Sequence, residues 1–222
     1  MRMNRSSTWH AHSPEPRCLE RKSRVHRVAC QLFARHGFEG THVRKVCDLA
    51  GVNIAFVCYH FRNKQGLYDA VRTEARKRFS RRSRCNLVSR RDLAAEQRLH
   101  AIIESLFPRL SGDSAWIIHL VARELAEGLK TSQATVSQGF RVDLDLLESV
   151  IREAVGPEAD ANTIRLDALN VLSQCLFYCA ARRALTRFSP KLDQPALKPQ
   201  RLVRHISLFS LRGLDERSKE NQ

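Results

Sequence analysis

Residues 41–68, THVRKVCDLAGVNIAFVCYHFRNKQGLY, contain two short helical patterns that meet at a glycine. Thr41 is a candidate N-cap of the first helix, because a threonine side chain can accept from a free backbone amide. Gly51 is the expected end of that helix, since glycine adopts the left-handed conformation without strain. Between them the apolar residues recur at the spacing of one helix face: Val43, Val46, Cys47 and Ala50.

A second helix is expected from Asn53, a further N-cap candidate, to about Tyr59. It has only about two turns, so neighbouring elements must hold it in place. We expect the following residues on its buried side: Ile54, Val57, Cys58 and Phe61. The opposite side offers Asn53, Ala55, Phe56, Tyr59 and His60. Asn63 can cap the next helix, and Lys64 in its first turn adds a cation where phosphate binds readily. This order predicts a helix-turn-helix unit that binds the DNA major groove.

The same region resembles the N-terminal domain of the TetR/AcrR family of transcriptional regulators. The resemblance lies in residues 32–41, LFARHGFEGT, and in the segment that follows them. Asn53-Ile54-Ala55, Tyr59-His60-Phe61 and Lys64-Gln65-Gly66-Leu67-Tyr68 are similar to the CecR-type subgroup, from which Phe56 and Cys58 depart. A weaker similarity extends over residues 115–187.

This resemblance implies a homodimeric regulator, most often a repressor, that a small-molecule effector releases from a palindromic operator. The last two long helices, about 161–188 and 200–212, would form the dimer interface, although their apolar stripes also suit an ordinary core within one chain. The residues expected to contact double-stranded DNA are Thr41, Arg44, Asn53, Ala55, Phe56, Tyr59, His60 and Lys64. Candidate residues of an effector cavity are Phe107, Trp116, His119, Arg123, Gln174 and Tyr178. For Arg123 and Glu124 a structural ion pair is the default role, and contact with a ligand is the alternative.

The charge of the chain, formally +15 at pH 7, is concentrated in one half. Residues 1–90 contain 20 Lys and Arg against 6 Asp and Glu, whereas residues 91–222 contain 18 against 17. A basic segment that coincides with the helix-turn-helix is expected for a protein that binds DNA. Charge runs such as 76–78 and 81–82 could equally form a solvated helix face.

Other features exclude several protein classes. No apolar run is long enough for a membrane span or a secretory signal, so we expect a cytoplasmic protein without a membrane partner. The seven cysteines contain no Cys-x-x-Cys pair, and we expect no metal site and no cofactor. No catalytic motif is present, so we expect no catalytic residue. Two alternatives stay open: a redox sensor that uses Cys175 and Cys179, and an architectural protein that binds DNA without sequence preference.

The helical periodicity predicts an all-α fold of about nine helices, with a three-helix N-terminal unit and a C-terminal bundle. We expect a disordered basic arm at 1–19, the DNA-binding domain at 20–66, and a connecting helix at 64–83. A domain for effector binding and dimerisation would occupy 84–213, and a disordered tail 214–222. Further helices are expected at about 20–36, 99–110, 116–127, 132–155, 161–188 and 200–212.

Overall fold

The computed structural model describes residues 16–82, 92–126, 137–192 and 194–220. Within these ranges it contains nine α-helices, two short 3-10 helices and no strand, which confirms the all-α prediction. The N-terminal helices are α1 (Pro16–His36), α2 (Val43–Ala50), α3 (Ile54–Phe61) and α4 (Lys64–Arg82). They are followed by α5 (Ala95–Leu110), η1 (Gly112–Ser114), α6 (Ala115–Ala126), α7 (Ser137–Val155), α8 (Ala161–Phe188), η2 (Gln194–Leu197) and α9 (Pro199–Glu220).

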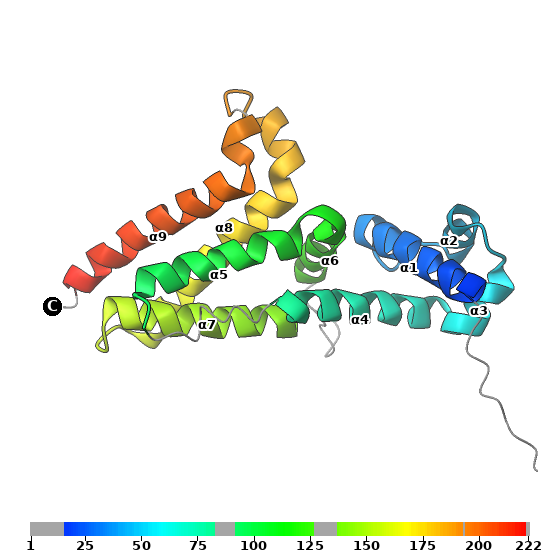
Figure 1. Cartoon of the computed structure of the whole chain (residues 1–222), viewed down its shortest axis with the longest axis horizontal. Coiled ribbons are helices and arrows are strands. Elements are labelled where there is room, and N and C mark those ends of the chain that lie inside the picture. The colour runs from blue at the N-terminus through cyan, green and yellow to red at the C-terminus, as the bar shows by residue number, and fades with distance from the viewer. Residues whose placement is uncertain (1–15, 83–91, 127–136, 193, 221–222) are drawn as a thin grey trace, which may run out of the picture.

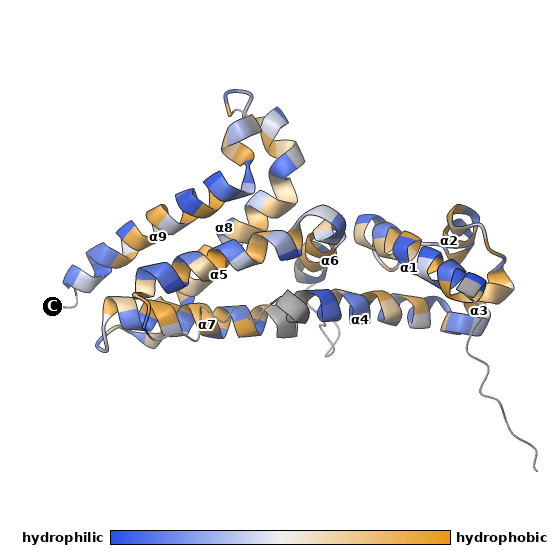
Figure 2. Ribbon diagram, in the orientation of Figure 1, coloured by the Kyte–Doolittle hydropathy of each residue, from blue (hydrophilic) through white to orange (hydrophobic). Residues whose placement is uncertain are grey.

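The molecule is elongated, with α1–α3 at one end and α5, α7, α8 and α9 toward the other (Figure 1). The connecting helix α4 runs from α3 toward α7, and α6 lies where the two parts meet. Hydrophobic and hydrophilic residues alternate around the long helices in the pattern of amphipathic packing (Figure 2). None of the described helices has the length and apolarity that a membrane span requires.

The N-terminal helices share a small apolar core. Phe33 of α1 is fully buried, and its ring lies 4.9 Å from that of Tyr68 on α4. Val46 and Val57 bring α2 and α3 into the same core, and Leu67 of α4 completes it. Gly51 ends α2 in the left-handed conformation, with φ of 63°, as the sequence predicted.

The junction of α3 and α4 is a tight turn with an unusual backbone. Arg62 has φ of 67° and ψ of −62°, and the amide of Asn63 donates to the carbonyl of Phe61 at 2.8 Å, which together define a γ-turn. Arg62 has the only positive φ among the described non-glycine residues. The side chain of Asn63 then accepts from the amide of Gly66 at 2.9 Å, so Asn63 caps α4 as predicted.

Two of the expected boundaries are wrong. The α1 helix begins at Pro16, so residues 16–19 do not belong to a disordered arm; proline is favoured in the first turn of a helix. The α9 helix continues through most of the expected tail to Glu220. Leu214 is buried there, and Arg217 forms an ion pair of 3.2 Å with Asp167 on α8, which gives this extension tertiary contacts. Residues 1–15, and residues 132–136 of the expected seventh helix, lie outside the described residues.

The C-terminal bundle is packed around α5, whose predicted apolar stripe is buried in full: Leu99, Ile102, Ile103, Leu106, Phe107 and Leu110. The same helix places Arg109 in the interior, where its Nη2 lies 2.7 Å from Oδ1 of Asp143 on α7. Both side chains are almost completely buried. A charge in such a place is tolerated only beside an opposite charge, so this pair links α5 to α7.

The backbone at Arg62 predicts an unusual order of stabilities. Arg62→Gly and Arg62→Ala both remove the side chain, but only glycine relieves the positive φ, whose strain costs about 1–3 kcal/mol. We expect the glycine variant to exceed the alanine variant by about 1 kcal/mol in the free energy of unfolding, measured with urea. An alanine variant of equal or greater stability would contradict a strained turn.

Gly66 of α4 and Gly213 of α9 are helical glycines with opposite surroundings. At Gly66 a Cβ would collide with the carbonyl oxygen of Phe61, whereas at Gly213 it would meet nothing within 4 Å. Gly66→Ala should therefore destabilise the protein by about 1–3 kcal/mol, because the backbone has to move. The matched control Gly213→Ala should stabilise it by roughly 0.5–1 kcal/mol through helix propensity. Thermal and urea unfolding of both variants measure the difference.

Candidate nucleic-acid interface and effector cleft

The orientation of α3 is set by two buried side chains, Val57 and Phe61. Ile54 and Cys58 were expected on the same buried side, but the structure exposes both, with Ile54 at 53%. The prediction was wrong because the neighbouring helices α1, α2 and α4 bury only one side of this eight-residue helix. That side accommodates a single i,i+4 pair.

The outward side of α3 is formed by four exposed residues: Ile54, Ala55, Cys58 and Tyr59. Tyr59 is 84% exposed. Asn53 caps the helix as predicted, and its Oδ1 accepts from the amide of Phe56 at 2.8 Å. Asn53 is exposed, but its side-chain oxygen is occupied by this bond.

Phe56 and His60 are less accessible than the sequence suggested. Their rings lie 4.3 Å apart, and both residues are half-buried. Sγ of Cys18, in the first turn of α1, lies 3.5 Å from Nε2 of His60. These two aromatic residues therefore form the edge of the exposed surface nearest to α1.

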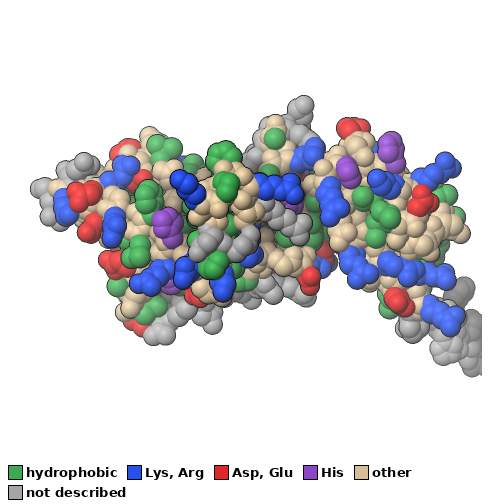
Figure 3. Space-filling view, turned by 90° about the horizontal axis from the view of Figure 1, so that it is seen from above, with side chains coloured by type: hydrophobic (Ala, Val, Ile, Leu, Met, Phe, Trp, Pro, Cys, Tyr) green, Lys and Arg blue, Asp and Glu red, His purple; other side chains and the backbone are tan. Residues whose placement is uncertain are grey.

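Basic side chains flank α3. Arg44 and Lys45 on α2 and Arg62 after α3 are exposed, and Figure 3 shows Lys and Arg gathered over the end of the molecule that contains α1–α4. Lys64 is half-buried instead. Its Nζ donates to the carbonyl of Glu39 at 3.3 Å and lies 4.6 Å from the ring centroid of Phe38, so it also holds the loop before α2.

Thr41 neither caps α2 nor lies where it could contact DNA, the two roles predicted for it. It is only 2% exposed, and its hydroxyl donates to the carbonyl of Gly37 at 2.7 Å. The residue that precedes α2 is His42, whose side chain makes no capping bond. Thr41 therefore braces the loop between α1 and α2, and its side chain is excluded from any surface that could meet DNA.

A cleft of about 2120 Å³ is lined by residues of α1, α4, α5, α6, α8 and α9. Five of the six predicted effector residues line it: Phe107, Trp116, His119, Arg123 and Tyr178. Gln174 does not. Leu197 and Leu202, near the start of α9, also line the cleft. They were not predicted, because they are far from the other lining residues in the chain.

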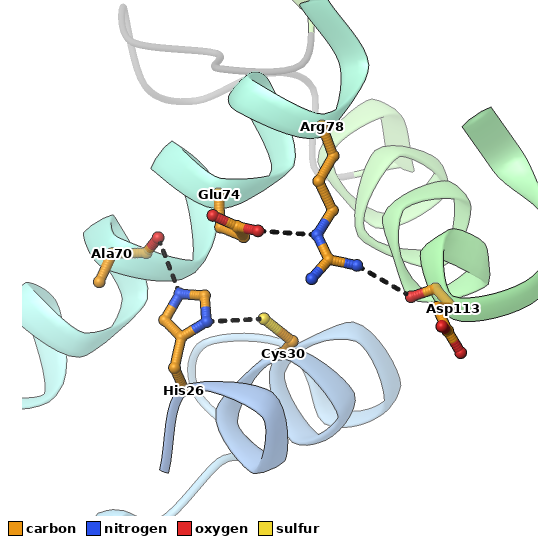
Figure 4. Close-up of polar contacts among 6 residues, drawn as sticks. All are labelled: His26, Cys30, Ala70, Glu74, Arg78 and Asp113. Atoms are coloured by element: carbon orange, nitrogen blue, oxygen red, sulfur yellow. Dashed lines mark hydrogen bonds and ion pairs between the residues drawn. The ribbon is translucent and has the colours of Figure 1, made fainter. Parts of the chain in front are cut away.

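The wall of the cleft formed by α1 and α4 is polar (Figure 4). His26 Nε2 lies 3.1 Å from the carbonyl oxygen of Ala70, which joins the two helices. Arg78 donates to Glu74 at 2.7 Å and to the carbonyl of Asp113 at 3.4 Å, so it joins α4 to η1. Across the whole cleft, eight Lys and Arg residues face three acidic ones, and the lining therefore favours an anion.

Two charged residues of α6 connect the bundle to the N-terminal helices. Arg123 donates through Nη2 to the carbonyl of Arg35 at 3.2 Å and packs against Gly37 at the end of α1. Glu124 forms an ion pair of 3.5 Å with Arg72 on α4, so Glu124 has the structural role considered in the sequence analysis. The end of α6 thus contacts both α1 and α4.

The cysteines considered as redox centres are poorly suited to that role. Burial raises the pKa of Cys175 to about 12, and burial likewise raises that of Cys179 to about 12 despite the nearby Arg182. Both thiols therefore stay protonated at neutral pH, and a protonated thiol is a weak nucleophile. The redox alternative finds no support here.

The outer side of α8 and α9 carries exposed apolar residues: Leu166, Leu169, Phe177, Leu208 and Phe209. Leu166 and Leu169 lie three residues apart on α8, with Phe177 about two turns further on, and Leu208 and Phe209 are neighbours on α9. Phe177 contacts the ring of Tyr178, and Phe209 that of His205, but all five residues keep at least 40% of their surface exposed. Exposed apolar patches of this kind commonly mark protein interfaces.

Comparison with known proteins places these features in one family. Residues 26–71 match the family described as bacterial regulatory proteins, tetR family. Residues 95–214, more than half of the chain, match the C-terminal domain of the HTH-type transcriptional dual regulator CecR.

Among curated proteins, the chain is similar to the HTH-type transcriptional repressor NicS of Pseudomonas putida, with 26% identity over 87% of this chain and 92% of NicS. It is also 38% identical over 53 residues to the probable regulator YttP of Bacillus subtilis. That match spans about a quarter of each chain, 24% of this one and 26% of YttP.

Solved structures share the fold at low identity. A tetR-family regulatory protein from Rhodococcus RHA1 has a TM-score of 0.64 and 17% identity, over 86% of this chain and 95% of that chain. AibR, solved with isovaleryl coenzyme A and operator DNA, has a TM-score of 0.59 and 18% identity, over 85% of this chain and 97% of AibR. FadR of Bacillus subtilis, solved with stearoyl-CoA, has a TM-score of 0.55 and 18% identity, over 88% of this chain and 98% of FadR. The chain belongs to the TetR family of bacterial transcriptional regulators and carries a CecR-type C-terminal domain.

Proposed function

We propose that this regulator is a homodimeric repressor that binds a palindromic operator and leaves it when an effector binds. The observation that carries the proposal is the exposed side of α3, flanked by the accessible cations Arg44, Lys45 and Arg62. Such a surface suits a major groove between two phosphate backbones. The name of NicS, a repressor, supports the direction of control.

The apolar side of α8 and α9 supports dimerisation, since a palindromic operator requires a two-fold symmetric protein. Two copies of α3 would have to lie roughly 34–36 Å apart, or a multiple of that distance, to enter successive major grooves. Burial of Phe177, Leu208 and Phe209 against a second copy would remove them from water. The hydrophobic effect would then drive the association.

The cleft supports an effector that combines an anionic group with an apolar one. Its lining includes an apolar part, with Phe107, Trp116 and Leu202, and basic side chains such as Lys77 and Arg182. AibR and FadR, which share the fold, were solved with acyl thioesters of coenzyme A. Molecules of this class carry both a phosphorylated head and an acyl chain, so they match the cleft in charge and polarity.

The contacts at the end of α6 offer a route from effector to operator. Arg123 touches α1, and Glu124 pairs with Arg72 on α4, so a shift of α6 would move the helices that hold α3. An effector that binds more tightly to one position of α6 than to the other shifts the protein toward that position. It changes operator affinity by at most the difference between its two binding free energies. A coupling of about 1–3 kcal/mol corresponds to a change of roughly 5–150-fold.

Substitution of Arg44 tests the DNA interface. Arg44→Ala should weaken binding to operator and random DNA alike and reduce the slope of log affinity against log salt by about one contact. Arg152→Ala, a change at an exposed site on α7, is the matched control and should alter neither quantity. Fluorescence anisotropy with genomic fragments that the protein selects measures both. If operator and random DNA are bound equally by the unmodified protein, the repressor proposal fails in favour of an architectural protein.

The coupling through α6 predicts reciprocal effects. Isovaleryl-CoA or stearoyl-CoA at saturation should lower operator affinity roughly 5–150-fold, and operator should lower acyl-CoA affinity by the same factor. Glu124→Gln weakens the ion pair with Arg72 and should change this factor while acyl-CoA affinity without DNA is retained, because Glu124 does not line the cleft. Glu148→Gln, which weakens a pair with Arg165 between α7 and α8, is the control. Calorimetry that detects no acyl-CoA binding would refute this effector class.

A further inference from the structure

The α3 helix lacks the side chains that usually identify bases. Its eight residues, IAFVCYHF, include no Arg, Lys, Asn, Gln, Asp or Glu. Arginine bound to guanine and asparagine or glutamine bound to adenine are the common bidentate contacts in the major groove. Asn53, directly before the helix, uses its side-chain oxygen to cap it, and Arg62, directly after the helix, leaves its axis at the turn into α4. Discrimination by hydrogen bonds from α3 is therefore restricted to few groups.

Of the remaining polar side chains of α3, few are accessible for hydrogen bonds to bases. His60 is half-buried between the ring of Phe56 and Sγ of Cys18, so it lies at the edge of the surface. The Tyr59 hydroxyl is the one accessible side-chain hydrogen-bonding group on the outward side of this helix apart from the weakly polar thiol of Cys58.

What α3 offers in their place is a continuous apolar surface. Ile54 and Cys58 are one helical turn apart, and Ala55 lies beside them. All three are exposed, although an exposed isoleucine is costly in water. Because Val57 and Phe61 are fixed in the core, the helix cannot rotate to hide this surface. The flanking cations Arg44, Lys45 and Arg62 favour a polyanionic duplex over an apolar protein as its partner.

We propose that Ile54, Ala55 and Cys58 recognise the 5-methyl groups of thymines, so that each operator half-site contains A·T pairs at the positions that face these residues. The thymine methyl is the one apolar group that a base pair presents in the major groove. Contact with α3 would remove the methyl and the three side chains from water together. Flanking phosphate contacts would set the register without identifying bases. The inference rests on the proposed operator binding and adds the kind of base pair recognised.

The test removes or restores single methyl groups in a selected operator. Replacing one dT by dU deletes the methyl and keeps base pairing, and we expect about a four-fold loss of affinity at contacted positions. That factor corresponds to about 0.8 kcal/mol, the value for one buried methylene-sized group. At the same positions, a 5-methyl-dC·dG pair should bind more tightly than dC·dG, because the methyl returns while the hydrogen-bonding groups of the pair do not change.

Protein variants assign the effect to residues. Ile54→Ser and Cys58→Ser should each bring the dT/dU affinity ratio close to one at the contacted position, since the variant has no apolar partner for the methyl. Both sites are exposed, so folding should be retained. Val142→Ser, at an exposed apolar site on α7, should leave the ratio unchanged.

The outcomes separate this inference from the function on which it rests. A specific operator whose affinity does not depend on any thymine methyl overturns the inference and leaves the repressor proposal intact. A dT/dU ratio that stays high in both serine variants overturns the assignment to α3, since the methyl would then act through DNA shape. If no DNA sequence is preferred over random DNA, both proposals fail.

Discussion

The burial of Val57 and Phe61 against the other N-terminal helices is the constraint on which the remaining features depend. An eight-residue helix is too short to persist in water by its own hydrogen bonds, so its existence and its direction both come from this contact. Once the two side chains are placed, the outward position of Tyr59 follows from helix geometry. The surface that we propose for DNA binding is thus determined by packing inside the protein.

The same constraint explains why strain is tolerated between α3 and α4. Only two residues, Arg62 and Asn63, connect the end of α3 to Lys64 at the start of α4. The γ-turn at Arg62 changes the direction of the chain within this short connection. Gly66 then passes so close to the Phe61 carbonyl that a side chain would not fit. Backbone strain of this kind is often found where function fixes the relative position of two elements.

Sequence patterns predicted the long helices well, because their periodicity extends over many turns. The α8 helix has the predicted bounds, 161–188, and it begins where Asp160 accepts from the amide of Thr163. Errors occurred where local pattern and tertiary contact compete. In a helix of eight residues, the pattern fits two arrangements equally well. Either Ile54 and Cys58 are buried together with Val57 and Phe61, or Val57 and Phe61 are buried alone. Packing selects the second arrangement. Thr41 resembled a cap, but a bond to the carbonyl of Gly37, whose φ is positive, occupies it.

The interior pair of Arg109 and Asp143 has a consequence for how sequences of this fold can diverge. Loss of either residue alone strands a charge in a dry core, at a cost of about 3–5 kcal/mol, whereas exchange of both for apolar residues can be neutral or favourable. The apolar alternative can therefore be reached only through an intermediate close to unfolding. Among descendants of a common ancestor, the ionic combination should therefore be inherited unchanged, because each single step away from it is strongly destabilising.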